Sequence, residues 1–399
     1  MNIAHSNSIN PCTSCQMCGA VCPTQAISIE LDEDGFYKPF VNNNKCINCE
    51  LCIKTCYKFD CDIHISTKEE LQRTTLYAAS AIEDDIVNNT TSGGIGDILA
   101  KELIKNGYYV VGVAYEYETD RAIHKVAKSV EGTNVFRGSK YIQPYSITSF
   151  REVIHNIKYQ KYAIFALPCQ IYAISKYLEK KGKRKQCILV DLYCHGCPSM
   201  HVWDKTTNMI KQELNCEQFD EVNFRSKRRG WGNFIIEAKA AKRKYISSPL
   251  DNCFFDLFFS NQVLNQSCTN CKLRGTLSYS DIRLGDFWGK KYRKNTRGIS
   301  GVSISTHEGE KIFEIIKPQI SFVKESLENF LPYQSWNHTY SINEEMRTTL
   351  FVMLKDKSKD IYFISHYFNQ QKSLKDKIKR IIKELLTLFP IKLAILFRR

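Results

Sequence analysis

Eight cysteines near the beginning of the chain have spacings that suit metal chemistry. They form two runs, each with three cysteines at intervals of three residues and a fourth after a wider gap: Cys12, Cys15, Cys18 and Cys22, then Cys46, Cys49, Cys52 and Cys56. Three thiolates spaced in this way can surround one face of an iron–sulfur cluster, while the fourth points to a neighbouring cluster. We therefore expect two [4Fe-4S] clusters, one held by Cys12, Cys15, Cys18 and Cys56 and the other by Cys46, Cys49, Cys52 and Cys22.

Structural zinc is the alternative, because pairs of cysteines three residues apart also bind zinc. Zinc sites usually combine two separated pairs, whereas here a run of three cysteines with a distant fourth occurs twice. The pattern closely resembles that of bacterial-type two-cluster ferredoxins. It departs from them at Tyr57, where the second run of such a ferredoxin has proline, and Cys61 follows soon afterwards. We therefore expect the chain to leave the second run by an unusual path.

A second set of cysteines follows predicted strands further along the chain. Cys169 comes after an apolar strand at 162–167, Cys194 comes after another at 187–193, and Cys268 and Cys271 form a later pair. The carboxyl ends of parallel strands meet at one edge of a sheet, so these cysteines are expected to converge. They predict a third metal site with four thiolate ligands.

Buried apolar thiols are the alternative for this second set. That interpretation suits Cys187, which lies within a predicted strand, and also Cys216 and Cys253. Cys197 is the close rival of Cys194 as a ligand.

Between and around these cysteines the pattern indicates an α/β fold. Strands are predicted at 76–81, 108–114, 162–167 and 187–193, with amphipathic helices at 95–105 and 170–179. Strands that alternate with helices are typical of an α/β domain with parallel strands. We expect an α+β ferredoxin-like module at residues 1–70, an α/β domain at 72–345 and a basic amphipathic tail at 371–399.

The composition indicates a soluble protein in a reducing compartment. The chain has 399 residues, of which 43% are hydrophobic and 25% are charged, but it has 17 cysteines. It lacks the basic and apolar segments of a secretory signal at its beginning and has no apolar run of about 18 residues that could span a bilayer. Cysteines bunched three residues apart suit metal or cluster ligation better than a secreted disulfide framework, and we expect a reducing, cytoplasmic location.

The net charge of +14 is concentrated toward the end of the chain, where residues 371–399 carry nine basic and two acidic residues. A helix packed on the protein with a solvated basic face explains this tail, and peripheral contact with an anionic inner membrane surface is the alternative. Nucleic-acid binding is not expected, because the basic residues are not interleaved with stacking aromatics.

Six motifs resemble those of the coenzyme F420 hydrogenase/dehydrogenase beta-subunit family. In chain order they are Thr91-Ser92-Gly93-Gly94, Gly138-Ser139-Lys140-Tyr141, LPCQ at 167–170, DLYCHGCPS at 191–199, CTNC at 268–271 and SDIRLGDFWG at 280–289. The resemblance covers roughly residues 72–345, and Leu167 departs from it by standing where the family often has a small hydroxylated residue. It implies that the α/β domain binds FAD and a third [4Fe-4S] cluster, on Cys169, Cys194, Cys268 and Cys271.

The same resemblance suggests which residues contact FAD. A Thr-Ser-Gly-Gly segment before a helix offers backbone N–H groups and a positive dipole end to a pyrophosphate, although a helix cap or turn would also explain it. Ser92, Gly93 and Gly94 are therefore expected at the FAD phosphates, with Lys140 close by as a cation. Asp286 is expected to line the pocket, together with Phe287 and Trp288.

Two further features have competing interpretations. The basic stretch at 224–232 is explained by a solvated loop, with binding of an anionic substrate or of the flavin phosphates as the alternative. His195 is explained as a hydrogen-bond donor beside a cluster ligand, with proton donation during reduction as the alternative.

Together these features predict an iron–sulfur flavoprotein oxidoreductase. It would pass electrons between ferredoxin, or another redox partner, and a small-molecule substrate through [4Fe-4S] clusters and FAD, because a flavin connects one-electron and two-electron chemistry. The resemblance implies a sugar-linked substrate, since family members in bacteria that lack the deazaflavin are often associated with surface-polysaccharide synthesis. The alternatives are an enzyme that oxidises reduced coenzyme F420, a non-catalytic electron-transfer subunit of a larger complex, and a zinc-stabilised scaffold.

Overall fold

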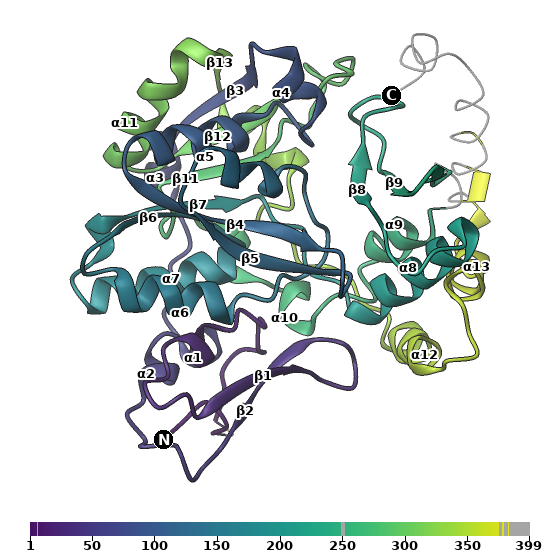
Figure 1. The fold of residues 1–399 in the computed structure, drawn as a ribbon, viewed down its shortest axis with the longest axis horizontal. Helices are drawn as coiled ribbons and strands as arrows, with labels where there is room; N and C mark the ends of the chain where they lie inside the picture. Colours follow the sequence, from purple (N-terminus) through teal and green to yellow (C-terminus); the bar gives the residue numbers. More distant parts are fainter. Residues whose placement is uncertain (6, 249–251, 375–376, 379–381, 383–399) are drawn as a thin grey trace.

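A mixed eight-stranded sheet forms the centre of the chain, and the two cysteine runs lie below it (Figure 1). The computed structural model describes residues 1–5, 7–248, 252–374, 377–378 and 382. The predicted tail at 371–399 therefore lies almost wholly outside the described residues. No described helix is long and apolar enough to cross a membrane.

The strand order of the large sheet is β13-β3-β12-β11-β7-β6-β4-β5. Four neighbouring strands, β11, β7, β6 and β4, run parallel, whereas the strands outside them pair antiparallel. In chain order the bounds are β3 Thr75–Ala81, β4 Tyr108–Glu116, β5 Arg121–Ala127, β6 Lys161–Phe165, β7 Cys187–Leu192, β11 Ile282–Asp286, β12 Ser300–Ile304 and β13 Ile320–Glu325. The four predicted strands are confirmed as β3, β4, β6 and β7, within a sheet of mixed direction.

Apolar side chains alternate between the two faces of the parallel strands, and both faces are buried. Val110, Ala163 and Ile188 pack on one side, against α5 (Ile95–Lys105) and α11 (His307–Ile316). Their sequence neighbours Val111, Ile164 and Leu189 pack on the other side, in a core that includes α6 and α7. Burial on both faces explains why these strands are continuous apolar runs. The predicted helices at 95–105 and 170–179 are confirmed as α5 and as α7 (Pro168–Lys180), and α6 is Ile147–Asn156.

The N-terminal module consists of short elements around its two cysteine runs. These elements are α1 (Met17–Ala20), the antiparallel hairpin β1 (Ile27–Leu31) and β2 (Tyr37–Val41), α2 (Leu51–Lys54), η1 (Tyr57–Phe59) and α3 (Lys68–Arg73). Its apolar residues share one core with α6 and α7. Gly19 marks the closest approach, because a Cβ there would lie 2.6 Å from Ile147 Cδ1. The module is therefore packed directly against the α/β sheet layer.

A second, smaller layer follows β7 in the sequence and lies beside the large sheet (Figure 1). It holds a three-stranded antiparallel sheet in the order β10-β9-β8 and four helices that pack near it. The bounds are α8 Met200–Leu214, β8 Glu221–Ser226, β9 Ile235–Ala240, β10 Arg243–Ile246, α9 Cys253–Phe258, α12 Glu344–Lys355 and α13 Ile361–Gln370. The remaining short elements are α4 Asp84–Asn88, η2 Glu131–Phe136, η3 Arg184–Gln186, α10 Gln266–Thr269, η4 Lys272–Gly275, η5 Lys317–Gln319, η6 Leu327–Asn329 and η7 Leu331–Tyr333.

A buried ion pair joins two parallel strands at the centre of the large sheet. Asp191 of β7 and Arg283 of β11 stand directly opposite each other in the strand register. Arg283 Nε donates to Asp191 Oδ1 over 2.7 Å, and Ser280 Oγ donates to the same oxygen over 2.9 Å. The two side chains are 2% and 1% exposed. Removal of either partner would leave the other as an uncompensated buried charge.

We expect Arg283→Met to lower the free energy of unfolding by about 3–5 kcal/mol, because Asp191 would lose its buried counter-charge. Replacing both partners together, as Asp191→Leu with Arg283→Met, should recover most of that loss, since no unpaired charge remains. Urea unfolding of both variants and of the parent protein, monitored by tryptophan fluorescence, measures these changes in the free energy of unfolding. A double variant less stable than the single one would contradict this account.

Candidate functional site

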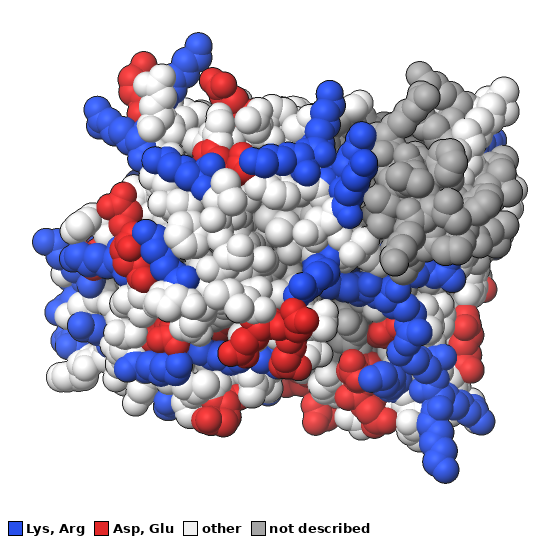
Figure 2. Space-filling model, turned by 90° about the horizontal axis from the view of Figure 1, so that it is seen from above, with Lys and Arg blue, Asp and Glu red and all other residues white. Residues whose placement is uncertain are grey.

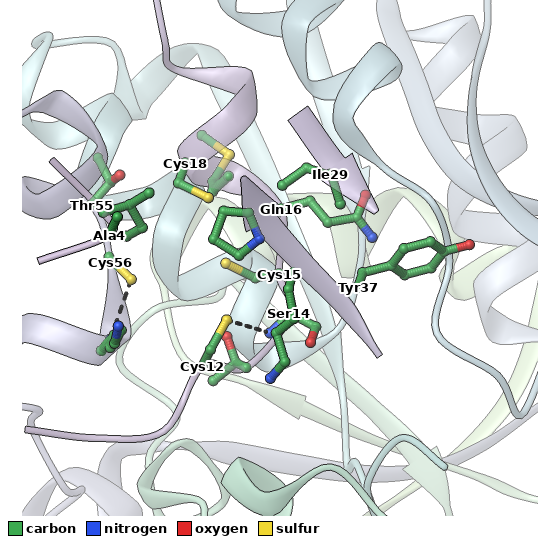
Figure 3. A pocket seen from close by; sticks show the side chains of 16 residues that line it. Ala4, Cys12, Ser14, Cys15, Gln16, Cys18, Ile29, Tyr37, Thr55 and Cys56 are labelled. Atoms are coloured by element: carbon green, nitrogen blue, oxygen red, sulfur yellow. Dashed lines mark hydrogen bonds between the residues drawn. The ribbon is translucent and has the colours of Figure 1, made fainter. Parts of the chain in front are cut away.

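The first predicted set of cysteines surrounds one hollow in the N-terminal module. Cys12, Cys15, Cys18 and Cys56 all line a cavity of about 230 Å³, and Figure 3 shows their sulfur atoms around a common space. Two of these sulfurs accept a backbone N–H bond at 3.4 Å, Cys12 from Ser14 and Cys56 from Lys58. The first run therefore meets the last cysteine of the second run, as the spacing predicted.

The second predicted set lines another, narrower hollow, of about 20 Å³. Cys22, Cys46, Cys49 and Cys52 all belong to it. Cys22 Sγ accepts the amide of Ala26 at 3.2 Å, and Cys46 Sγ accepts the side-chain amide of Asn2 at 3.6 Å. The structure thus combines three cysteines of the second run with the last cysteine of the first.

The backbone conformation of the first cysteine run is repeated in the second. Ser14 and Asn48, at equivalent places in the two runs, have φ values of 57° and 51°. Gln16 and Glu50, which precede α1 and α2, have φ values of 67° and 61°. Four non-glycine residues in the left-handed region are unusual, and their repetition turns each run around its own hollow.

Burial and mutual repulsion make the thiols of the first hollow costly to ionise. Burial raises the pKa of Cys15 to about 11, and the charge of Cys12 adds to the rise. The pKa of Cys18 is also well above its usual value, first because of burial and then because of repulsion by Cys15, Cys56 and Cys12. Ionised thiolates in such a space need positive charge, which the iron of a cluster supplies.

Within the described ranges, no group of three or more His, Cys, Asp and Glu side chains is placed to hold a metal ion. In a four-iron cluster, by contrast, each thiolate binds its own iron atom.

A third group of thiols lies where α7 begins and β7 ends. Cys169 is in the first turn of α7, Cys194 follows β7, Cys268 lies in α10, and Cys271 precedes η4. The charges of Cys194, Cys271 and Cys268 each raise the pKa of Cys169, in addition to the effect of burial. The structure therefore brings together all four predicted ligands of the third cluster.

Cys197, the predicted rival of Cys194, joins the same group. Its thiol donates a hydrogen bond to Cys268, which lowers the pKa of Cys268 to about 7 and raises that of Cys197. Five thiols therefore lie together where four cluster ligands are predicted, and the choice between Cys194 and Cys197 stays a prediction.

The first and third groups of thiols are neighbours. After burial, the largest cause of the raised pKa of Cys169 is the charge of Cys15. Tyr57, which stands where ferredoxins have proline, lies at the same junction. Its hydroxyl accepts the amide of Lys272 at 3.3 Å, and its ring packs edge-on against Tyr172 with centroids 6.1 Å apart. The unusual path after the second run is therefore a contact with the α/β layer, and Cys61 beyond it is exposed.

Buried amide side chains hold the first cysteine loop against this layer. Gln143 Nε2 donates to the carbonyls of Thr13 and Ser14 at 3.1 and 2.7 Å. Gln16 Nε2 donates to Pro144 O at 2.7 Å, while its Oε1 accepts the amide of Ser146 at 2.7 Å. Each such bond contributes about 1 kcal/mol net, and a broken one leaves a costly unpaired group.

Asn265 connects two of the thiol groups directly. Its Nδ2 donates to Ser14 Oγ at 3.0 Å, and its Oδ1 caps α10, the helix that carries Cys268. One side chain thereby orients a loop of the first group and a helix of the third. These glutamine and asparagine residues had no recognisable sequence signal, because their partners are more than 100 residues away.

The residues predicted at FAD form one connected network above the sheet. The amide of Ser139 donates to Thr91 Oγ1 at 2.7 Å, which links the Gly138–Tyr141 motif to the Thr91–Gly94 motif. Ser92 Oγ donates to Ile299 O at 3.0 Å, and the amide of Gly93 donates to Ser300 Oγ at 3.0 Å. Gly94, with a φ of 84°, precedes α5. The amides that open a helix have no partner within it, so this end of α5 suits an anion.

Lys140 and Asp286 already have partners within the chain. Lys140 Nζ donates to three carbonyl oxygens at the end of η2, the nearest being Arg137 O at 2.9 Å, and burial lowers its pKa to about 7. Asp286 accepts Arg225 at 2.5 Å and the indole N–H of Trp231 at 2.8 Å. Their roles toward FAD stay predictions.

The solvated-loop interpretation of the basic stretch at 224–232 holds for Arg228 and Arg229, which are exposed, but it is wrong for Arg225, which is buried. Arg225 is 2% exposed and joins Asp286 to Tyr141, to whose hydroxyl it donates at 3.2 Å. Trp231 is buried and stacks on Trp288 with centroids 4.7 Å apart. Lys227 Nζ donates to Ser92 O at 2.6 Å, beside the Thr91–Gly94 loop. Burial lowers the pKa of Lys227 to about 7, and the charge of Arg225 lowers it further.

His195, next to Cys194, is held by hydrogen bonds at both ring nitrogens. Nε2 lies 2.8 Å from Asn261 Oδ1, and Nδ1 lies 3.1 Å from the hydroxyl of Tyr340. Burial lowers its pKa to about 4, so the ring is neutral near pH 7. Its two roles, as hydrogen-bond donor and as proton donor, stay predictions.

Comparison with known proteins places these residues in two matched segments. Residues 159–329 match the family model for the C terminus of the coenzyme F420 hydrogenase/dehydrogenase beta subunit, and residues 11–58 match the model for a 4Fe-4S dicluster domain. A similar solved structure is the xenon-derivatized F420-reducing [NiFe] hydrogenase complex from Methanosarcina barkeri, with 15% identity over 71% of this chain and 90% of that chain and a TM-score of 0.46. No curated protein matches the chain. The two matched segments contain all twelve predicted cysteine ligands.

We expect Cys56→Ser to lower the iron content of the anaerobically purified protein by about four atoms, because the first group would lose a ligand. Cys61→Ser is the matched control, since Cys61 is exposed and lies outside both hollows. Iron and acid-labile sulfide analysis measures both variants. Equal iron in the two variants would show that Cys56 is not a ligand.

Proposed function

We propose that this chain is an iron–sulfur flavoprotein oxidoreductase, because residues 159–329 match the C-terminal model of the coenzyme F420 hydrogenase/dehydrogenase beta subunit and residues 11–58 match a 4Fe-4S dicluster domain. It would pass electrons between a ferredoxin-like redox partner and an organic substrate. The observation that carries the proposal is the proximity of Cys15 in the first thiol group to Cys169 in the third.

Different residues would hold the clusters and pack the N-terminal module against the α/β layer. Cys12, Cys15, Cys18 and Cys56 would hold one cluster, Cys22, Cys46, Cys49 and Cys52 a second, and Cys169, Cys194, Cys268 and Cys271 a third. Such clusters carry single electrons, and FAD supplies the exchange between single electrons and pairs. Gln16 and Gln143 hold the first thiol group against the α/β layer through buried hydrogen bonds, and Asn265 joins this group to the third.

The Thr91–Gly94 loop is the proposed place for the FAD phosphates. The loop stands at the N-terminus of the 11-residue helix α5, and Lys227 is bonded to Ser92 O. Helix N-termini and a nearby ammonium both favour phosphate. Lys227 therefore joins Ser92, Gly93 and Gly94 in the proposed contact set, and Lys140 and Asp286 support the set through their neighbours.

The substrate is proposed from family resemblance alone, as a small molecule linked to a sugar. On the face seen from above, Lys and Arg side chains are interspersed with Asp and Glu (Figure 2).

The composition of the purified protein tests the proposal. We expect about 12 iron atoms and one FAD per chain after anaerobic purification, because three four-iron clusters and one flavin are proposed. Metal analysis and the flavin absorption spectrum measure both quantities. Zinc without flavin would reject the proposal in favour of a scaffold.

The rate at which different electron donors bleach the flavin absorption tests which donor reduces the protein. Reduced ferredoxin should reduce the bound flavin faster than NADPH or NADH does, since the cysteine runs are proposed as the electron entry. Faster reduction by reduced coenzyme F420 would favour the F420-oxidising alternative. Substrate turnover by the chain supplied only with a donor would contradict the non-catalytic alternative.

We expect Cys169→Ser and Cys268→Ser each to lower the iron content by about four atoms, because both would hold the third cluster. Cys216→Ser is the control, since Cys216 lies near the end of α8 and outside the three thiol groups. The same iron analysis on Cys194→Ser and Cys197→Ser identifies the fourth ligand. Unchanged iron in Cys268→Ser would reject the third cluster while leaving the first two intact.

A further inference from the structure

Three arginine side chains of the described residues are almost completely buried. Arg225 and Arg283 are each 2% exposed, and Arg274 is 4% exposed. Arg225 pairs with Asp286, and Arg283 pairs with Asp191. Arg274 forms no ion pair with any carboxylate in the part of the chain that the structure describes. Its positive charge is therefore the exception among the three.

Backbone carbonyls hold the Arg274 guanidinium in a fixed orientation. Nη1 donates to His195 O at 3.0 Å, and Nη2 donates to His338 O at 2.6 Å and to Thr269 O at 3.3 Å. The group lies 4.3 Å from the centroid of the Tyr340 ring. Nε is buried without a hydrogen-bond partner. These contacts satisfy most N–H groups, but they provide no negative charge.

Hydrogen bonds place this charge beside the thiols of the third group. The carbonyl acceptors of Nη1 and Nη2, His195 O and Thr269 O, belong to the residues that follow Cys194 and Cys268 in the chain. Arg274 also follows Cys271 closely in the chain, and its amide donates to Cys271 O at 3.3 Å. The guanidinium therefore belongs to the third thiol group.

A buried charge without a counter-charge costs several kcal/mol. That cost is offset when the neighbouring thiols are ionised, as they are when they bind iron. The unpaired guanidinium thus fits an anionic group on Cys194, Cys268 and Cys271.

We propose that Arg274 is the counter-charge of the third cluster and raises its reduction potential, an inference that rests on the proposed cluster. When the cluster accepts one electron from a reductant, its net charge becomes more negative by one unit. A fixed positive charge in a site of low dielectric stabilises this reduced state more than the oxidised state. Arg274 thereby makes the third cluster a better electron acceptor than its thiolates alone would.

The test compares Arg274→Met, which removes the charge, with Arg274→Lys, which keeps it. Midpoint potentials of the loaded full-length protein are measured by titration with dithionite and ferricyanide, followed by electron paramagnetic resonance. The third cluster is the component that is missing from Cys268→Ser. We expect Arg274→Met to weaken reduction at least tenfold, a shift of about 59 mV to lower potential for one electron. Arg274→Lys should shift the potential by less than half as much.

Arg243→Met is the matched control, because Arg243 also donates to a backbone carbonyl, Leu214 O at 3.0 Å, but lies on the surface. Its third-cluster potential should equal that of the parent protein. Equal shifts in Arg274→Met and Arg274→Lys, or no shift in Arg274→Met, would overturn the proposal.

If Arg274→Met does not bind the third cluster, its reduction potential cannot be measured, and the iron content becomes the test. A loss of about four iron atoms in Arg274→Met but not in Arg274→Lys supports a requirement for the charge. The same loss in both variants overturns it, since hydrogen bonding or shape would then be the cause. Full iron content in Cys268→Ser would instead reject the third cluster itself, so the two failures are distinguishable.

Discussion

The free-energy cost of ionising thiols enclosed by protein is the constraint on which the rest of the structure depends. Each of the three groups crowds at least four cysteines together, and burial together with mutual repulsion raises the pKa of Cys15, Cys18 and Cys169. Such groups are stable as thiolates only beside compensating positive charge. The fold supplies N–H donors to Cys12, Cys22 and Cys56, and it places the unpaired Arg274 beside the third group.

Docking of the N-terminal module turns separate thiol groups into neighbours. Gly19 lets α1 approach α6, and Gln16, Gln143 and Asn265 complete the hydrogen bonds of loops that would otherwise carry buried unpaired groups. Since an unsatisfied buried polar group costs about 1–3 kcal/mol, the joined arrangement is strongly favoured over a displaced one. Tyr57 adds an aromatic contact at the place where an independent ferredoxin would have proline.

The network around the Thr91–Gly94 loop consists of hydrogen bonds and ion pairs of charged side chains, not of thiols. Arg225 joins Asp286 to Tyr141, and Lys227 binds the carbonyl of Ser92, so that charged residues from distant segments brace one loop at the N-terminus of α5. Arg225 and Lys227 of the basic stretch thus stabilise this loop from inside the protein, whereas Arg228 and Arg229 are exposed. Burial of Arg225 is tolerable because Asp286 accompanies it.

The sequence by itself determined the local features: the cysteine spacings, the strands β3, β4, β6 and β7, and the helices α5 and α7. These depend on side-chain periodicity and on distances of a few residues, which the chain order already contains. Only the tertiary structure decided that Cys15 lies near Cys169, that Cys197 joins the third group, and that Gln143 and Asn265 hold the module in place. It also decided that Arg225 is buried with a carboxylate partner, whereas Arg274 is buried with backbone carbonyls as its hydrogen-bond acceptors. Such contacts join residues far apart in the chain, and whether a charge meets its counter-charge depends on packing that local pattern does not describe.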